Sequence, residues 1–191
     1  MSIAKEFLGK HIKYLLSFLL FSQVAFASFL VEPHFNKVSG TFERADTEGD
    51  MTGEYLGLRL AYTNKFFMIG INLEKGHYSY DSEVSATKHS HYNGGGVGTF
   101  LGFHFFDRLR IWTGYLNSVL EANGNKDQRF FGQQVEFGIG YRLWKNIFVN
   151  YSYINNFFTQ EENDITGETG SIEEIIKVKS NSLSISSIFV F

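Results

Sequence analysis

Apolar and polar residues alternate along much of the chain, and the alternation is clearest in its last twelve residues, Ser180–Phe191. Leu183, Ile185, Phe189 and Phe191 share one parity there, while the opposite parity begins with serines. A period of two predicts a β-strand. The same signal predicts eight strands, with approximate limits Phe29–Ser39, Glu54–Thr63, Phe66–Tyr80, Gly95–Phe106, Leu109–Ser118, Gly132–Leu143, Ile147–Phe158 and Lys179–Phe191.

The predicted connections alternate in length. Tyr62–Lys65, Phe106–Arg108 and Trp144–Asn146 are tight turns built on Asn or Asp. With an even number of strands, all short turns and both termini lie at one end. This asymmetry predicts an all-β, up-and-down antiparallel β-barrel that spans a membrane. The predicted long loops are Gly40–Gly53, Asp81–Gly94, Val119–Phe131 and Thr159–Val178.

The apolar parity has aliphatic residues in mid-strand and aromatic residues near strand ends. Tyr62 and Tyr141 lie near short turns, and Tyr115 and Tyr153 lie near long loops. Two aromatic girdles around an aliphatic band are typical of a protein in a bilayer. A soluble lipocalin-like barrel, the alternative, keeps its apolar face inside. The girdles favour the membrane barrel.

The polar parity contains three acidic and three basic residues. An Arg turned toward lipid would cost roughly 2–4 kcal/mol at mid-depth, so we expect these residues to face the lumen. In a narrow interior each charge needs a partner, and small residues such as Gly138 and Gly140 leave room for the larger ones. The pattern predicts a lumen plugged by the charge network Glu32, Arg59, Glu74, Arg110, Glu136 and Arg142.

The N-terminal residues predict a secretory signal peptide. A head with three lysines precedes an uncharged stretch of about 13 residues, 14–26, which overlaps the small-x-small cleavage pattern Ala25-Phe26-Ala27. A transmembrane helix, the alternative, needs roughly 20 apolar residues. We therefore expect residues 1–27 to be removed and a barrel domain to span 28–191, beginning at Ser28.

Composition narrows the function. The chain contains no cysteine, so neither disulfides nor thiolate metal sites are expected. The net charge is −3 and no basic block occurs, which argues against nucleic acid binding. Mean hydropathy is −0.12, as expected when alternating faces average out. We expect no cofactor.

In these patterns the whole of 28–191 resembles the small eight-stranded outer-membrane barrels, the superfamily of OmpA-type, OmpX-type and OmpW-type proteins. In that family the last strand ends in Phe after alternating apolar residues and is read by the outer-membrane assembly machinery. Leu183, Ile185, Phe189 and Phe191 match, whereas Ser187 departs from the pattern. The resemblance implies an integral outer-membrane location, with lipid, lipopolysaccharide and the assembly machinery as partners. It also implies a monomer.

Two groups of residues could carry chemistry. His77 and Ser79 share the outward parity, resembling the His-x-Ser of lipid A deacylases, and Glu83 could orient a base. However, Tyr-Asp-Ser follows Ser79, where Asn-Ala-Gly is expected in that family. His89 and His91, with nearby carboxylates, could bind Zn²⁺ or Cu²⁺. We expect both groups to be ordinary polar residues.

Acidic residues gather in the first and last long loops, where carboxylates could bind hard cations such as Ca²⁺. Their spacing matches no calcium loop, so we expect a solvated surface. These residues are Glu43, Asp46, Glu48, Asp50, Glu161, Glu162, Asp164, Glu168, Glu173 and Glu174.

Three functions remain open. The first is a non-enzymatic barrel with a structural or surface-interaction role. The second is a narrow pore or a conduit for small hydrophobic solutes. The third is an enzyme that modifies lipid A. Pairing of the lumen charges would favour the first over the second.

Overall fold

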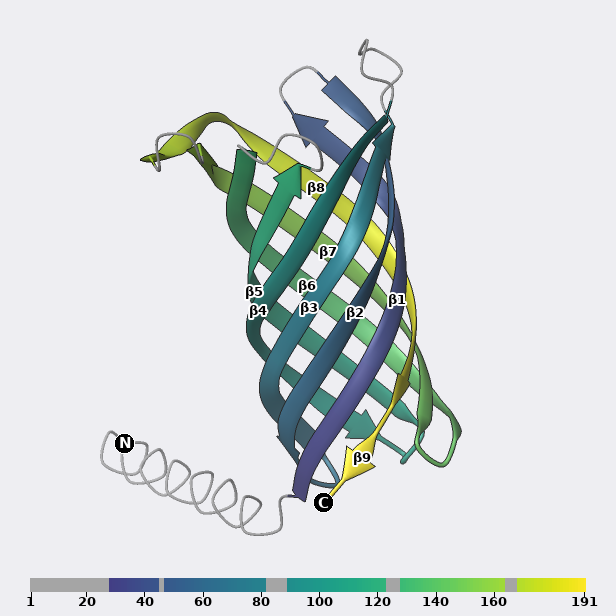
Figure 1. Ribbon diagram of the computed structural model, residues 1–191. Helices are drawn as coiled ribbons and strands as arrows, with labels where there is room; N and C mark the ends of the chain where they lie inside the picture. The colour runs from purple at the N-terminus through teal and green to yellow at the C-terminus, as the bar shows by residue number, and fades with distance from the viewer. Residues whose placement is uncertain (1–27, 45–46, 82–88, 123–127, 164–167) are drawn as a thin grey trace, which may run out of the picture.

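A computed structural model describes residues 28–44, 47–81, 89–122, 128–163 and 168–191 (Figure 1). The predicted signal peptide and its cleavage residues Ala25 and Ala27 lie outside this part of the chain. None of the described residues forms a helix long and apolar enough to cross a membrane. The strands are β1 (Ser28–Arg44), β2 (Thr47–Thr63), β3 (Phe67–Asp81), β4 (His89–Phe105), β5 (Leu109–Ala122), β6 (Gln128–Trp144), β7 (Ile147–Asn163), β8 (Glu168–Ser187) and β9 (Phe189–Val190).

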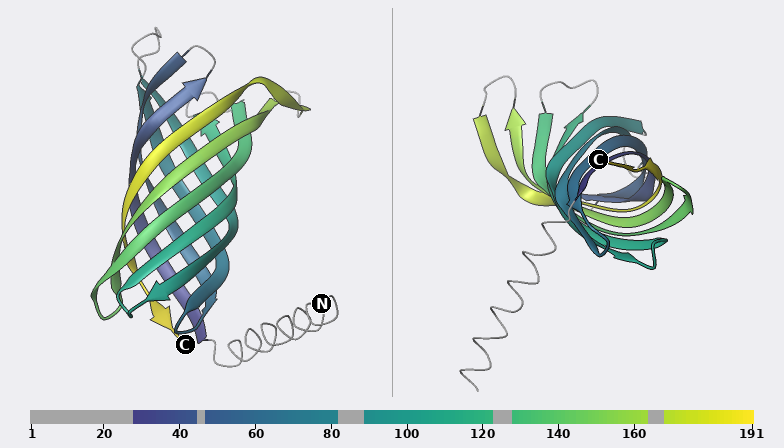
Figure 2. Two further views of the ribbon diagram at one scale, coloured as in Figure 1. Left: turned by 180° about the vertical axis from the view of Figure 1, so that it is seen from behind. Right: turned by 90° about the horizontal axis from the view of Figure 1, so that it is seen from below.

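The strands close into a barrel. Each strand from β1 to β8 pairs antiparallel with its neighbours in sequence, and β1 also pairs with β8 and with its short continuation β9. The end-on view shows the resulting ring (Figure 2). An up-and-down ring of eight strands has no free sheet edge at membrane depth. The predicted fold class and the closure between the first and last strands are confirmed.

The chain's one proline, Pro33, lies on β1 between its pairing with β9 and its pairing with β8. Phe29 and Phe191 exchange both backbone hydrogen bonds, at 3.1 and 2.9 Å. Backbone hydrogen-bonded positions alternate along an antiparallel pair, so the backbone nitrogen of Pro33 points toward the last strand, as that of Phe29 does. Pro33, however, has no N–H to donate there. The last strand is interrupted nearby at Ile188, whose N–H donates to the Asn146 carbonyl on its other side, at 2.8 Å.

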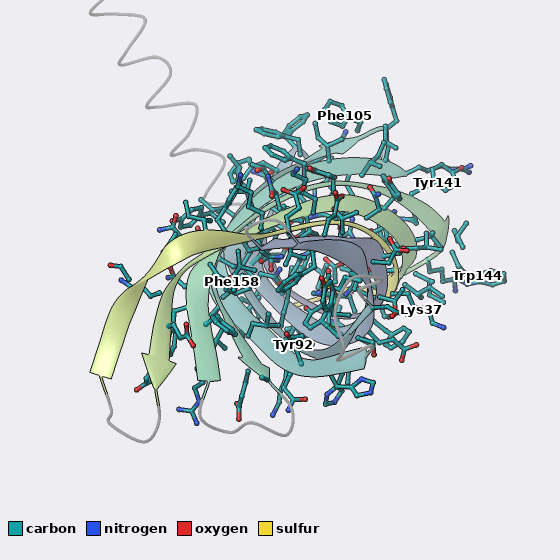
Figure 3. All side chains as sticks on the ribbon, turned by 90° about the horizontal axis from the view of Figure 1, so that it is seen from above. Lys37, Tyr92, Phe105, Tyr141, Trp144 and Phe158 are labelled. Carbon is teal, nitrogen blue, oxygen red and sulfur yellow. The ribbon has the colours of Figure 1, made fainter. Side chains whose placement is uncertain are left out.

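An apolar belt surrounds the barrel. Leu56, Phe137 and Ile185 each expose more than half of their surface, and Figure 3 shows Phe105 and Tyr141 pointing away from the wall. Exposed apolar surface of this extent needs an apolar medium. A closed barrel satisfies its own backbone groups in lipid. The protein is therefore a transmembrane barrel.

The belt divides the barrel into two parts, called the membrane segment and the hairpin segment. The membrane segment lies within the belt, and its end with the short turns is called the turn end. The hairpin segment projects beyond the belt on the other side, from the Lys37–Glu54 pair outward. It consists of residues 37–44, 47–54, 75–81, 89–95, 117–122, 128–133, 155–163 and 168–181.

The strands extend farther into the hairpin segment than the sequence predicted. β1 continues to Arg44 instead of ending at Ser39, and β2 begins at Thr47 instead of Glu54. Most of the described residues in the predicted long loops are thus paired strand, and the predicted loop limits were wrong. In the opposite sense, the last predicted strand is broken at Ile188.

The far parts of β7 and β8 bend away from the barrel axis (Figure 1). The pairing register shifts between Phe158 and Gln160, which marks a bulge in the β7–β8 pair. Bulges bend strands and increase their twist. The bend therefore has a local structural cause.

The interior is layered along the barrel axis. A first apolar layer lies toward the turn end, charged and hydroxyl-bearing residues fill the middle, and a second apolar layer fills the hairpin segment. The first layer is Leu30, Ala61, Met68, Phe100, Trp112, Phe148 and Ile188. The second is Phe42, Met51, Leu120, Phe130, Phe158, Ile176 and Val178, with Tyr78, Tyr80 and Tyr92 packed against it.

Candidate functional site

Four charged side chains meet across the middle of the lumen. Arg110 donates to both carboxylate oxygens of Glu32, with Nη1 to Oε2 at 2.8 Å and Nη2 to Oε1 at 2.5 Å. Arg59 Nη2 donates to both oxygens of Glu136, at 3.2 and 3.3 Å, and its Nη1 lies 3.7 Å from Glu32 Oε1. All four side chains are at most 2% exposed. In the ring of eight, β5 stands four places from β1 and β6 four places from β2, so the Arg110–Glu32 and Arg59–Glu136 pairs cross the lumen.

Aromatic rings pack against the two guanidinium groups. The Trp112 ring lies 4.6 Å from the Arg59 guanidinium and 5.3 Å from that of Arg110. Phe148 lies 4.2 Å from Arg110 on another side. Cation–π contacts of this kind strengthen where water is excluded. The charged cluster is thus held between aromatic faces.

Small residues make the room for this packing. A Cβ at Gly138 would lie 2.1 Å from the Trp112 ring, and one at Gly140 would lie 2.7 Å from Arg110 Nε. Both glycines stand on β6 and face inward, as the alternation predicted. A larger residue at Gly138 would displace the indole ring from between the arginines.

Neutral polar groups complete the hydrogen bonding on one wall. Arg110 Nη2 also donates to Asn150 Oδ1 at 2.7 Å and to Ser186 Oγ at 3.1 Å. Asn150 Nδ2 in turn donates to Ser184 Oγ at 3.0 Å and to Ser186 Oγ at 3.1 Å. Ser184 and Ser186 of β8 therefore face a filled lumen. The cluster of Glu32, Arg59, Arg110 and Glu136, called the lumen cluster below, is electrically neutral.

Glu74 and Arg142 stand apart from the lumen cluster. Glu74 accepts hydrogen bonds from Asn72 Nδ2 at 2.6 Å and Gln134 Nε2 at 3.0 Å, and the Arg142 guanidinium lies 5.2 Å from the Phe148 ring. Within the described part of the chain, neither forms an ion pair with an opposite charge. The structure therefore brings together four of the six predicted charges and leaves one acid and one base at opposite sides of them.

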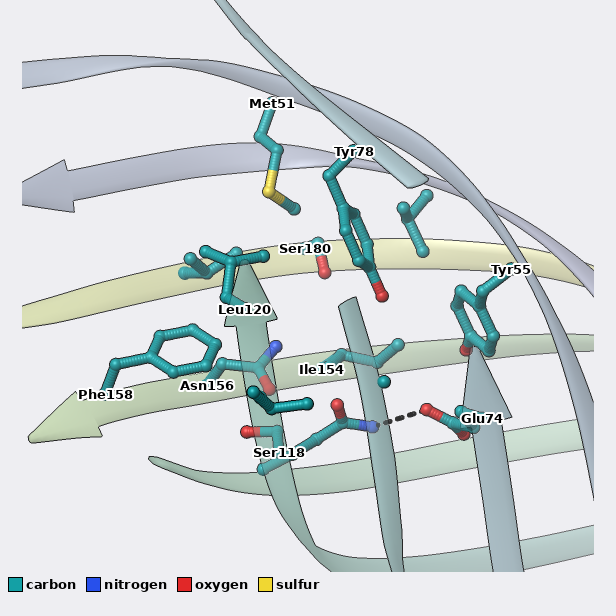
Figure 4. A pocket seen from close by; sticks show the side chains of 15 residues that line it. Met51, Tyr55, Glu74, Tyr78, Ser118, Leu120, Ile154, Asn156, Phe158 and Ser180 are labelled. Atoms are coloured by element: carbon teal, nitrogen blue, oxygen red, sulfur yellow. Dashed lines mark hydrogen bonds between the residues drawn. The ribbon is translucent and has the colours of Figure 1, made fainter. Parts of the chain in front are cut away.

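A narrow cavity lies beside Glu74, at the base of the second apolar layer (Figure 4). The Tyr55 and Ser118 hydroxyls and the Glu74 carboxylate line its polar part, and Met51 and Leu120 belong to its apolar part. The dashed line in Figure 4 is the hydrogen bond from Gln134 to Glu74. The cavity combines hydrogen-bonding groups with an apolar roof, and the lumen cluster separates it from the turn end.

The candidate residues His77 and Ser79 do not bond each other. Ser79 Oγ and His91 Nδ1 share a hydrogen bond of 3.0 Å, whereas His77 Nδ1 bonds Asn93 Oδ1 at 2.5 Å. Ser79 and His91 face each other across the β3–β4 pair, a contact that only the strand register could have revealed. The suggested orienter, Glu83, lies outside the described residues.

The candidate metal ligands near His89 and His91 are only partly described by the structure. Among side chains whose positions are described, no group of three or more His, Asp or Glu residues is close enough to hold a metal ion. The side chain of His89 is not among them. Of the acidic residues in the predicted loops, Glu43 accepts a 2.7 Å hydrogen bond from Lys179, which lowers the pKa of Glu43 and raises that of Lys179.

The residues of the predicted C-terminal assembly signal lie on the outer wall. Leu183, Ile185, Phe189 and Phe191 are all exposed. The last two lie in the turn-end half of the seam between β1 and the last strand, opposite Val31 and Phe29. Ser28, the predicted mature start, begins β1. This arrangement leaves the four signal residues accessible from the lipid side.

Comparison with solved structures finds small outer-membrane barrels. Neisserial surface protein A is 11% identical with a TM-score of 0.52, covering 83% of this chain and 96% of that one. Ail, the attachment invasion locus protein of Yersinia pestis, solved with the heparin analogue sucrose octasulfate, is 9% identical with a TM-score of 0.50, covering 85% and 99%. No protein-family model and no curated protein matches the sequence. The predicted resemblance in fold to the eight-stranded barrels is confirmed.

Proposed function

We propose that this chain is a non-enzymatic protein of a Gram-negative-type outer membrane, with a closed lumen and a structural or surface-interaction role. The turn end then faces the periplasm and the hairpin segment faces the surroundings. The fold shared with a surface protein and an attachment protein supports this role. Lipid and lipopolysaccharide surround the belt, and the assembly machinery reads the last strand.

The observation that carries a closed lumen is the lumen cluster. The interior of an eight-stranded barrel is just wide enough to be filled by side chains. Here the Arg110–Glu32 pair crosses that interior with both partners fully buried. Separating the two would leave buried charges unpaired, which costs about 3–5 kcal/mol. Passage of a solute through the closed state is therefore opposed by the ion pairs themselves.

Planar bilayer recordings test the closed lumen. The wild-type protein should show no steady openings, whereas the double variant Glu32→Ala with Arg110→Ala should show small openings because a neutral pair has been removed. Lys37→Ala with Glu54→Ala removes an equivalent pair from the outer surface and should stay closed. Steady wild-type openings would favour the pore instead, and unchanged closure of the lumen variant would show that other groups form the plug.

Lipid A hydrolysis is a second candidate, favoured by the Ser79–His91 hydrogen bond on the outer surface. A nucleophilic serine needs a base within such reach, and the base needs an orienting group. We expect Ser79→Ala and the neighbouring control Thr52→Ala to leave the lipid A of expressing cells identical to that of wild-type cells. A change in acyl chains that requires Ser79 would replace the non-enzymatic proposal.

A further inference from the structure

A second concave surface opens at the turn end of the lumen. This cavity has a volume of about 270 Å³, and its basic residues are Lys65, His104 and Arg142. Leu30 and Ile188 line its apolar wall. It lies on the far side of the lumen cluster from Glu74. We call it the turn-end cavity.

The fold holds the basic groups of this cavity in place. In the β2–β3 turn, the Asn64 side-chain oxygen accepts N–H bonds from Phe66 at 2.7 Å and Phe67 at 2.9 Å, which holds Lys65 at the rim. On the same side of the barrel, the His104 backbone N–H of β4 donates to the Phe66 carbonyl at 2.7 Å, and His104 Nε2 shares a 3.2 Å hydrogen bond with Thr63 Oγ1. The turn-end cavity is therefore a built feature of the barrel wall.

The charge of the turn-end cavity is unbalanced. Arg142 has no carboxylate partner within the described part of the chain, and its Nε is buried without a hydrogen bond. Asp107, held in the β4–β5 turn with a positive φ of 59°, is the one acid among the lining residues. The neutral lumen cluster supplies no net charge to offset Arg142. With His104 counted as neutral, Lys65 and Arg142 therefore exceed the local acid by one positive charge.

We propose that the turn-end cavity binds a phosphate group, carried either by a small soluble ester or by a lipid headgroup. A guanidinium offers paired N–H donors that match phosphate oxygens, and a lysine adds a mobile point charge. The Thr63 hydroxyl also lines the cavity, but it donates to the Asn64 and Phe67 carbonyls at 3.4 and 3.3 Å and so supports the turn. This inference is independent of the proposed role of the hairpin segment, because it concerns the opposite end of the barrel.

Both sources of phosphate can reach this end. Each short turn exposes one large aromatic residue, namely Phe66, Phe106 or Trp144, and such residues lie at the level of lipid headgroups. A headgroup from the neighbouring leaflet could therefore enter at the rim. A soluble ester would enter directly along the barrel axis.

The test compares binding of two probes to the purified full chain in non-ionic detergent. Inorganic phosphate is titrated by calorimetry, and phosphatidylglycerol is compared with uncharged diacylglycerol by native mass spectrometry. Arg142→Gln should weaken phosphate binding roughly tenfold or more, since hydrogen bonds to charged groups are strong. Lys65→Gln should weaken it less, and it provides a second variant if Arg142→Gln fails to fold.

Lys145→Gln is the matched control. It removes one positive charge from another short turn, but Lys145 does not line the cavity. Its binding should stay within about twofold of wild type, as expected for a screened charge outside the site. Equal weakening by Lys145→Gln and Arg142→Gln would overturn the site in favour of a general basic rim, and failure of both probes to bind would overturn it outright. Binding of only one probe identifies the source of the phosphate.

Discussion

The hairpin segment and the middle of the membrane segment, which lies beyond the first apolar layer, are built from the same strands but have opposite polarity. On β1, the inward residues are Glu32 and Asn36 in the membrane segment and Phe42 in the hairpin segment. The outward residues change in the reverse sense, from Phe35 to Lys37. Inward and outward residues continue to alternate along the strand, but the polar face becomes apolar and the apolar face becomes polar.

This exchange shows that the surrounding medium decides which face is apolar. Inside the belt, lipid accepts the apolar face, so the interior can hold charges if each is paired. Beyond the belt, water takes the outer face, and the interior becomes an apolar core like that of a soluble β-protein. The predictions below test whether the two interiors depend on these different sources of stability.

The largest effect is expected in the charged interior. Arg110→Met leaves Glu32 buried without its bidentate partner, so the free energy of unfolding should fall by about 3–5 kcal/mol. Urea unfolding in detergent, followed by the mobility difference between folded and unfolded protein on gels, measures this change. Adding Glu32→Leu should restore part of the loss, because the orphaned charge is then gone.

The exposed ion pair provides the control for that comparison. Lys37 and Glu54 are 70% and 57% exposed, and exposed pairs contribute about 0–1 kcal/mol. Lys37→Met should therefore change the unfolding midpoint little. If Lys37→Met lowered the free energy of unfolding as much as Arg110→Met, burial would not explain the contribution of the lumen cluster to stability.

A somewhat smaller loss is expected in the apolar interior. Leu120 is 4% exposed within the second apolar layer, and Leu120→Ala should cost about 2–4 kcal/mol through lost burial and the cavity left behind. Limited proteolysis should show the hairpin segment opening before the membrane segment. Thr52→Ala, on the outer face of the hairpin segment, should stay within about 0.5 kcal/mol of wild type; a loss equal to that of Leu120→Ala would contradict an interior core.

Loss of one serine hydroxyl from the inner face of β8 should reduce the free energy of unfolding less. Ser184 Oγ accepts one of two hydrogen bonds from Asn150 Nδ2, so Ser184→Val should cost about 0.5–1.5 kcal/mol. The same unfolding assay measures it. An increase in stability would show that the membrane segment, like the hairpin segment, prefers an apolar interior.

The smallest effect concerns pH and the exposed Glu43–Lys179 pair in the hairpin segment. The pKa of Glu43 is lowered, so its contribution is present above the usual carboxyl range and disappears as pH falls through the folded value. The pKa of Lys179 is raised, so its contribution is lost as pH rises through the folded value. NMR titration should show both shifts, and Lys179→Gln should return the Glu43 pKa toward its ordinary value. A lowered Glu43 pKa in that variant would point to another cause.

Alternation was sufficient to predict the strand order, the closed barrel and the inward direction of all six lumen charges. Alternation could not predict the position of each charged side chain along the barrel axis, because that position depends on strand register and tilt. Glu74 and Arg142 share the parity of the lumen cluster, yet they lie on opposite sides of it. The Ser79–His91 contact was missed for the same reason, since it depends on the β3–β4 register.

The extent of the hairpin segment was missed for a different reason. Glycines such as Gly49, Gly53 and Gly94 resemble turn residues in the sequence, but in the structure they lie in paired strands. A Cβ at Gly53 would lie 2.6 Å from the Tyr78 ring, and one at Gly94 would lie 2.4 Å from it. These glycines therefore accommodate the aromatic side chains of the second apolar layer.

The second apolar layer also has a consequence for engineering. Because it packs the strand ends beyond the belt, each hairpin forms a stem that does not rely on lipid for its support. A foreign peptide substituted for residues 123–127 would leave the stem paired up to Glu121 and Arg129. For an inserted flexible peptide, each doubling of its length adds only about 0.6 kcal/mol of closure cost. The barrel is therefore suited to displaying inserted epitopes at a defined distance above a membrane.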